Sequence, residues 1–140
     1  MKQGTITGIS GPVIDVCFPE GSLPAINEAL TVEANGQRYT MEVEQHLENK
    51  TVRCVMMAGS DGLARGLTVT ATGHGIRVPV GEKTLGRMFN VLGDPIDGEP
   101  PVDESAPRWE IHRAAPTFAE QMPAADILET LSLIHISEPT

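Results

Sequence analysis

The chain has 140 residues and a formal net charge of −9, so its field opposes a phosphate backbone and we expect no nucleic-acid partner. Hydrophobic residues make up 40% of the chain, which excludes a disordered polymer, and no run approaches the roughly 18 apolar residues of a membrane-spanning helix. The 14 Gly and 11 Pro, with many Val, Ile and Thr, favour short strands joined by tight turns.

The first residues, Met1 to Gly4, contain neither an apolar signal core nor an Arg-rich transit helix. We therefore expect a cytoplasmic chain that begins at Met1 and does not insert into a membrane. Cys17 and Cys54 lie in apolar, strand-like runs, where free buried thiols are the usual state. Two cysteines alone do not make a disulfide framework, so a disulfide is the minor alternative.

Apolar residues alternate with polar ones through the first part of the chain, as in half-buried strands. The first pair of predicted strands runs from Thr5 to Phe18 and is broken by a bend or bulge at Gly11-Pro12. Alternation resumes from Leu30 to Ala34. The next residues, Asn35-Gly36, predict a hairpin because both tolerate positive φ.

The return strand, Tyr39 to Val43, places Thr40, Glu42 and Glu44 on its other face, and alternation returns over residues 52–56. Ser60-Asp61-Gly62 predicts a further turn, and residues 69–72 and 76–80 are shorter strand candidates. Five or six short strands with turns about every ten residues indicate a small closed barrel or a sandwich over residues 1–80.

From residue 81 the pattern becomes irregular. We predict one helical turn at residues 82–85, a strand at 87–91, a turn at Gly93-Asp94-Pro95 and a short helix at 124–130. Residues 98–107 are rich in Pro, Asp and Glu and have no apolar period, so we interpret them as an irregular surface segment.

One short run invites comparison with a phosphate-binding loop. Gly81-Glu82-Lys83-Thr84 ends in Lys-Thr, but the loop requires G-x-x-x-x-G-K-[ST], in which successive backbone N–H groups surround the phosphates. Glu82 directly before Lys83 would repel phosphate. We interpret the run as a solvated helical turn.

No other pattern assembles a catalytic or metal site. The histidines are scattered without metal-ligand spacing, and the serines lack the G-x-S-x-G elbow. The acidic loop lacks D-x-[DN]-x-[DN]-G spacing, so solvation is favoured over a hard cation. We therefore predict no catalytic, cofactor-binding or metal-binding residues. The groups considered are His46, His74, His112 and His135; Ser10, Ser22, Ser60, Ser105, Ser132 and Ser137; and Asp94, Asp97, Glu99, Asp103 and Glu104.

Several short runs follow one another in a characteristic order. They are residues 4–18, Val43-Glu44-Gln45-His46-Leu47, Val52-Arg53, Asp61-Gly62-Leu63-x-Arg65-Gly66, Val78-Pro79-Val80-Gly81, Thr84-Leu85-Gly86-Arg87, Asn90-Val91-Leu92-Gly93-Asp94-Pro95-Ile96-Asp97 and Ile111-His112-Arg113-Ala114-Ala115-Pro116. Together these runs resemble the beginning of the beta subunit of rotary F-type ATP synthases, and the resemblance extends from about Lys2 to Thr130. The run that begins at Asp61 is similar to beta rather than to alpha or a vacuolar-type relative.

The resemblance implies a mainly β fold. A six-stranded β-barrel is expected at residues 1–80, followed at 81–130 by the incomplete start of an α/β nucleotide-binding domain. In the family, alpha and beta barrels alternate in a hexameric ring on the catalytic head of a complex that uses a proton gradient to make ATP from ADP and phosphate. The implied partners are alpha subunits and other subunits of that complex. The implied location is the inner face of a bacterial plasma membrane, where the subunit is peripheral.

The resemblance ends at Thr130. Residues 131–140 read LSLIHISEPT where the family continues toward its phosphate loop. They resemble translated sequencing-adaptor sequence, and we interpret them as a non-native tail. The family's phosphate-binding Lys, magnesium-ligand Thr and catalytic Glu have no counterparts here, so we expect no Mg-ATP or Mg-ADP to bind this fragment.

We therefore expect an assembly module that is not catalytic alone. One alternative is a full-length catalytic beta subunit represented here by a broken copy. Another is a free-standing barrel that binds nucleic acid, but that requires a basic face with stacking aromatics, and the chain has one Trp, Trp109.

Overall fold

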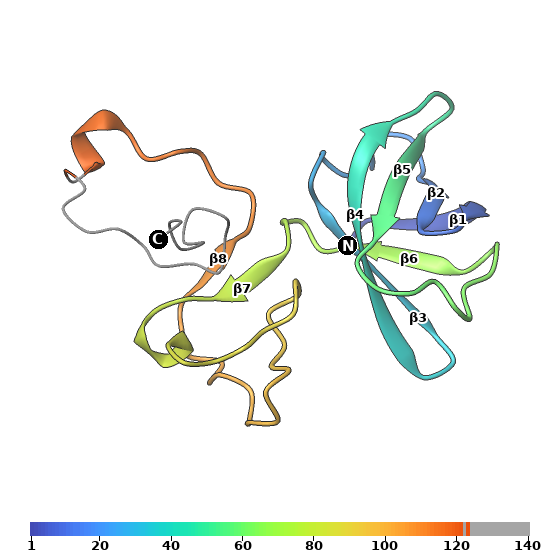
Figure 1. Cartoon of the computed structure of the whole chain (residues 1–140). Helices are drawn as coiled ribbons and strands as arrows, with labels where there is room; N and C mark the ends of the chain where they lie inside the picture. Colours follow the sequence, from blue (N-terminus) through green and yellow to red (C-terminus); the bar gives the residue numbers. More distant parts are fainter. Residues whose placement is uncertain (122, 124–140) are drawn as a thin grey trace, which may run out of the picture.

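The computed structural model describes residues 1–121 and residue 123. The helix predicted at residues 124–130 and the tail at 131–140 lie outside the described residues. Six strands form one closed barrel in the order β1-β2-β5-β4-β3-β6, with every neighbouring pair antiparallel (Figure 1). The six are β1 Gln3–Ser10, β2 Val13–Cys17, β3 Ala29–Ala34, β4 Gln37–His46, β5 Thr51–Met56 and β6 Thr68–Ala71.

The closed barrel confirms the predicted mainly β fold and decides against a sandwich. β1 and β2 form a hairpin whose turn lies at Gly11-Pro12, where Gly11 has φ +59°. The bulge is separate from this turn and falls within β1, between Ile6 and Gly8. The predicted hairpin at Asn35-Gly36 is confirmed, with φ values of 53° and 76° that match the twist of the two strands.

Alternate residues of all six strands point into the barrel and form a single core. Because successive side chains of a strand point to opposite faces, each strand contributes every second residue. The buried cluster comprises Ile6, Ile14, Val16, Phe18, Leu30, Val32, Met41, Val43, Val52, Cys54, Met56, Val69 and Ala71. Many of the predicted alternating positions belong to this cluster, such as Leu30, Val32, Met41, Val43 and Val52, whereas Ile9 and Val13 of the first strand pair are only half-buried.

The chain then forms a second segment, residues 77–121, beside the barrel (Figure 1). Within residues 1–121, its strands β7 Arg77–Pro79 and β8 Arg108–Glu110 pair only with each other, so the strand candidate at 76–80 does not belong to the barrel. The segment also has two 3-10 turns, η1 Glu82–Thr84 and η2 Phe118–Glu120. In the described part of the chain, no helix has the length and apolar character needed to span a membrane.

The strand predicted at residues 87–91 is wrong. Only an isolated bridge between Phe89 and Pro95 forms there. The Asn90 side chain accepts hydrogen bonds from the N–H groups of Leu92 and Asp94 at 3.0 and 2.9 Å, which closes a tight loop instead of extending the chain. The predicted helical turn at η1 and the irregular segment at 98–107 are both confirmed.

Candidate functional site

The chain leaves the barrel at a point that is fixed by hydrogen bonds. The Thr72 hydroxyl lies 2.7 Å from the carbonyl oxygen of Ala29 and 2.8 Å from that of His74. The Ala29 N–H also donates to the His74 carbonyl at 2.9 Å. These contacts attach the exit of the chain to the start of β3, at the other end of that strand from the Asn35-Gly36 hairpin.

Glu42 and His112 form the polar centre of the junction between barrel and second segment. Glu42 lies on the outward side of β4, as predicted, yet only 5% of it is exposed because the second segment covers it. His112 Nε2 lies 2.9 Å from both carboxylate oxygens. A buried carboxylate is costly without a donor, so the imidazole N–H compensates a large part of the desolvation penalty.

A second carboxyl group, Glu44, lies beside this pair. Burial raises the pKa of Glu44 above its ordinary value, and a hydrogen bond with Glu42 and the charge of Glu42 raise it further. His112 opposes this increase. The junction therefore holds two interacting carboxyl groups and one imidazole, contributed by the barrel and by the second segment.

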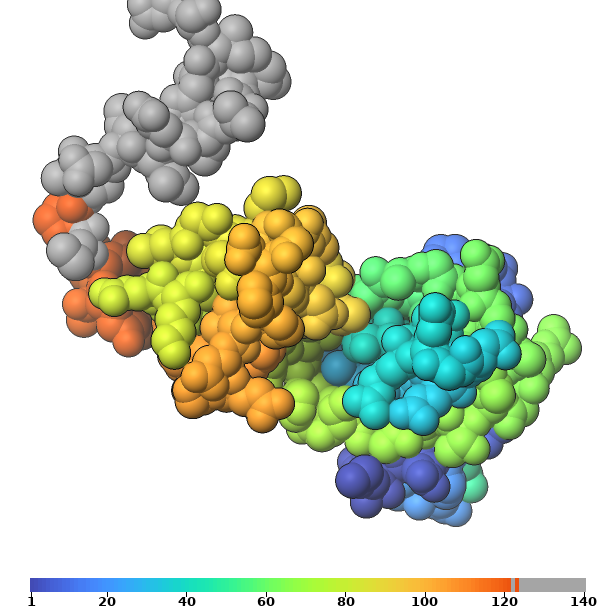
Figure 2. Space-filling view, turned by 90° about the horizontal axis from the view of Figure 1, so that it is seen from below, coloured from blue at the N-terminus to red at the C-terminus, as the bar shows by residue number. Residues whose placement is uncertain are grey.

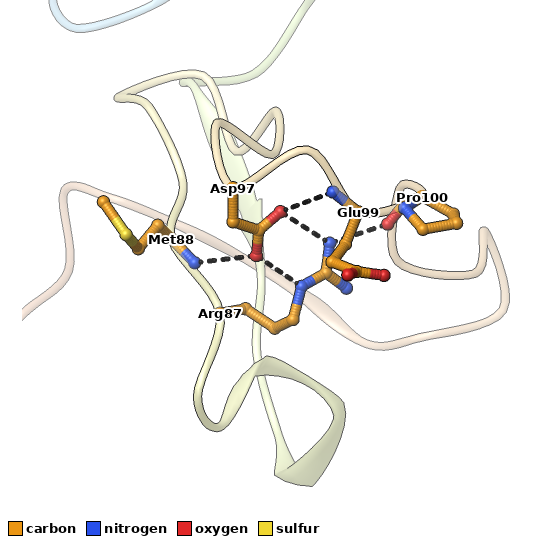
Figure 3. Close-up of polar contacts among 5 residues, drawn as sticks. All are labelled: Arg87, Met88, Asp97, Glu99 and Pro100. Atoms are coloured by element: carbon orange, nitrogen blue, oxygen red, sulfur yellow. Dashed lines mark hydrogen bonds and ion pairs between the residues drawn. The ribbon is translucent and has the colours of Figure 1, made fainter.

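Arg87 and Asp97 form a clasp within the second segment (Figure 3). Arg87 Nε donates to one Asp97 oxygen at 2.7 Å and Nη2 to the other at 3.3 Å, while the N–H groups of Met88 and Glu99 donate to the same carboxylate. Arg87 also donates to the Pro100 carbonyl at 2.7 Å. The clasp holds residues 87–100 together, a stretch in which the isolated Phe89–Pro95 bridge takes the place of regular strands.

These bonds determine the protonation of Asp97. The Arg87 guanidinium, helped by the two backbone N–H groups, holds the pKa of Asp97 well below its usual range. The four donors occupy the carboxylate, which leaves it poorly placed to ligate a cation. Within residues 1–121 and 123, no three His, Cys, Asp or Glu residues gather in a way that could hold a metal ion.

Several of the other groups considered in the sequence have local structural contacts. Thr84 Oγ1 donates to Gly81 O at 2.6 Å, and Lys83 lies 3.7 Å from Asp103, so the Gly81–Thr84 run is a solvated turn. His46 contacts the Pro24 carbonyl, and the His74 ring contacts the Gly75 carbonyl. His135 lies outside the described residues.

Both cysteines are free thiols, as predicted: Cys17 is half-buried and Cys54 is fully buried. Burial raises the pKa of Cys54 to about 12, and the negative charges of Asp15 and Glu44 contribute. A thiol with such a pKa is a poor nucleophile at neutral pH. Cys54 therefore serves the core as a small apolar residue.

The Ser60–Gly66 loop folds against the Asn35-Gly36 hairpin. The Tyr39 hydroxyl donates to the Asp61 carbonyl at 2.8 Å, and the Gly66 N–H donates to the Ile6 carbonyl at 2.9 Å. Gly62 has φ +90°, and a Cβ at this position would lie 2.6 Å from Asn35 Nδ2. The positive φ favours glycine at this position, and a larger residue would also displace the Asn35 side chain.

Comparison with known families identifies the barrel. Residues 6–73 match the model of the ATP synthase alpha/beta family, beta-barrel domain. The barrel is similar to the beta-barrel domain of the ATP synthase alpha/beta family. The match covers nearly all of the six barrel strands and stops before β7, in agreement with the separate pairing of β7 and β8. The match and the closed six-stranded barrel fit the N-terminal part of an ATP synthase alpha/beta subunit, and this similarity suggests assembly with other subunits of the complex.

Sequence reasoning missed the Glu42–His112 junction. Both residues were visible, Glu42 as an outward strand position and His112 as a scattered histidine, but they are 70 residues apart. Their proximity depends on the second segment folding back onto β4. The one available signal, an acidic residue within a strand of the family barrel, does not specify a partner.

Proposed function

We propose that this chain is part of a beta subunit of an F-type ATP synthase and that these residues serve assembly. The observation that carries the proposal is the run Asp61-Gly62-Leu63-x-Arg65-Gly66, which resembles beta and lies within the family barrel. The run has a structural reason for its glycines, because Gly62 and Gly66 both adopt positive φ. The runs beyond residue 73 follow one another in the same order as in beta, and they support the same assignment.

The proposed partners are alpha subunits, with which the barrel would alternate in a hexameric ring. The parent complex would make ATP from ADP and phosphate at the expense of a proton gradient. We place it as a peripheral assembly on the cytoplasmic, inner face of a bacterial plasma membrane.

We further propose that these 140 residues do not bind Mg-ATP by themselves. Phosphoryl-transfer sites need a backbone cradle, a Lys that reaches the phosphates and a hydroxyl on the metal. The sequence printed here contains no G-x-x-x-x-G-K-[ST] run. The nearest candidate, Gly81–Thr84, is a 3-10 turn with Lys83 paired to Asp103.

Two measurements test the proposal. Purified chain is mixed with recombinant alpha subunits of an F-type ATP synthase, or with beta subunits as the control, and complexes are separated by size-exclusion chromatography. We expect co-elution with alpha and not with beta; the reverse preference would assign the chain to alpha. Isothermal titration with Mg-ATP should give no heat of binding, and micromolar affinity would contradict the non-catalytic assignment.

A further inference from the structure

A groove lies where the two bodies of Figure 2 adjoin, the barrel in blue to green and the second segment in yellow to orange. It has a volume of about 540 Å³. Thr31 and Thr40, on the outer side of β3 and β4, are part of its lining, and Ile76 and Leu92 add apolar surface. A hollow of about 630 Å³ shares Thr31, Arg38 and Thr72 with this groove, so the two form one continuous surface.

Cations are concentrated in the groove. Arg38, Arg77 and Arg108 all line it, which places three of the ten Lys and Arg residues of a chain with net charge −9 in one concavity. Asp94 is the one acidic residue in the lining. The lining residues themselves comprise three cations and one anion, in contrast to the net charge of the whole molecule, and this arrangement favours an anionic ligand.

The three arginines are available for a new ligand. Arg38 pairs with Glu33 at 2.9 Å, but their side chains are 69% and 72% exposed. Arg77 pairs with Glu110 at a long 3.5 Å. Among the described residues, Arg108 forms no ion pair and no side-chain hydrogen bond, and it is part of the groove lining. Because exposed ion pairs contribute little to stability, an incoming carboxylate can replace them at little cost.

The chemistry favours an acidic peptide over a nucleic acid. A phosphate backbone carries a dense, continuous charge that the net charge of −9 repels, whereas the carboxylates of a peptide are spaced apart and can pair with individual guanidinium groups. The threonine hydroxyls offer hydrogen bonds to a peptide backbone. Ile76 and Leu92 offer contact to its apolar side chains.

We propose that this arginine groove binds an acidic segment of a neighbouring subunit. The inference rests on the proposed function, because it assigns to the ring partner a docking surface between barrel and second segment. Arg108, Arg77 and Arg38 would hold the partner's carboxylates, and the threonines would hold its backbone. Because both parts of the chain line the groove, the neighbouring subunit would dock when the second segment lies correctly against the barrel.

The test uses the whole chain and a fluorescein-labelled peptide of alternating Glu and Ala, followed by fluorescence anisotropy. Binding should occur at about 0.01 M salt, where the Debye length is about 30 Å, and weaken at about 0.15 M, where it is about 8 Å. The variant R77E/R108E should lose at least about tenfold in affinity. The variant K83E/K50E, which changes the net charge equally outside the groove, is the matched control.

Three results would overturn the inference: no peptide binding, equal losses in both variants, or tighter binding of a single-stranded DNA of equal length. Circular dichroism of each variant establishes that it is folded. Co-elution with alpha subunits is measured separately on the same variants. If the chain co-elutes with alpha and R77E/R108E changes neither peptide binding nor co-elution, the groove assignment is wrong and the proposed function still stands. If peptide binding depends on the arginines but the chain does not co-elute with alpha, the proposed function is wrong and the groove still binds acidic peptides.

Discussion

Glu42 and His112 meet across the junction between barrel and second segment, with the imidazole Nε2 2.9 Å from both carboxylate oxygens. This contact buries a carboxylate on what would otherwise be the wet face of a strand. It also fixes the position of the second segment relative to the barrel, because hydrogen bonds to a charged group depend on distance and direction. The arginine groove is formed between the same two parts.

Removing the imidazole should loosen the junction. We expect His112→Ala to cost about 1–3 kcal/mol, because it leaves the Glu42 carboxylate buried without its donor. Glu42→Gln retains the shape and should cost less. Urea unfolding followed by the fluorescence of Trp109, which lies in the second segment, measures both. In a double-mutant cycle the two costs should not add, since the residues share one interaction; simple additivity would contradict a direct coupling.

The Arg87–Asp97 clasp should make the second segment sensitive to acid. The folded-state pKa of Asp97 is depressed, so its stabilising contribution is present above the ordinary carboxyl pKa of 3.8. That contribution is lost as the pH falls below this value toward the folded-state pKa. Asp97→Asn should remove this acid dependence, as measured by thermal melts between about pH 2 and pH 6.

The exposed pair of Glu33 and Arg38 provides the control for the clasp. Its side chains are 72% and 69% exposed, and Glu33→Gln should change stability by no more than about 1 kcal/mol. Equal responses of Glu33→Gln and Asp97→Asn would mean that the clasp does not hold the segment.

Cys54 should resist alkylation while the barrel is folded. Its pKa of about 12 leaves a thiolate fraction near pH 8 about a thousandfold below that of an ordinary thiol, and its side chain is fully buried. Mass spectrometry after iodoacetamide treatment should find Cys17 labelled first, and both thiols labelled in urea. Rapid native labelling of Cys54 would contradict the described core.

The same thiol predicts a loss of stability in alkali. Because the folded-state pKa is raised, its contribution is fully present below the unfolded value of about 9 and is lost as the pH rises from there toward about 12. Cys54→Ala should reduce this dependence of stability on pH. The loss of the buried sulfur should lower the stability by the same amount at every pH. Urea midpoints at pH 8 and pH 10 give the comparison.

Truncation in the core should be far more costly than truncation at the surface. Leu30 is fully buried, and Leu30→Ala should cost about 2–5 kcal/mol through lost burial and the cavity that remains. Leu85 is 77% exposed, and Leu85→Ala should stay within about 0.5 kcal/mol. Circular dichroism during urea unfolding distinguishes the two. A small effect at Leu30 would mean that the barrel core is not packed as described.

The sequence by itself determined most of the barrel strands, although their pattern alone allowed a sandwich as well as a closed barrel. Period-two patterns such as Leu30, Val32 and Ala34 fix which side of a strand is buried, and Asn35-Gly36 fixes a hairpin, because both signals act between residues that are close along the chain. The tight loop around Asn90 was misjudged, since a single side chain accepting two N–H groups there overrides a strand-like composition.

Only the tertiary structure decided what happens between the barrel and the second segment. It determined that β7 pairs with β8, that Glu42 is buried beneath His112, and that Arg38 and Arg108 share a groove. Each of these relations joins residues that are at least 29 positions apart in the sequence. Neither periodicity nor local turn chemistry carries information over such separations, because they describe neighbours in the sequence, whereas these contacts arise when one surface packs against another.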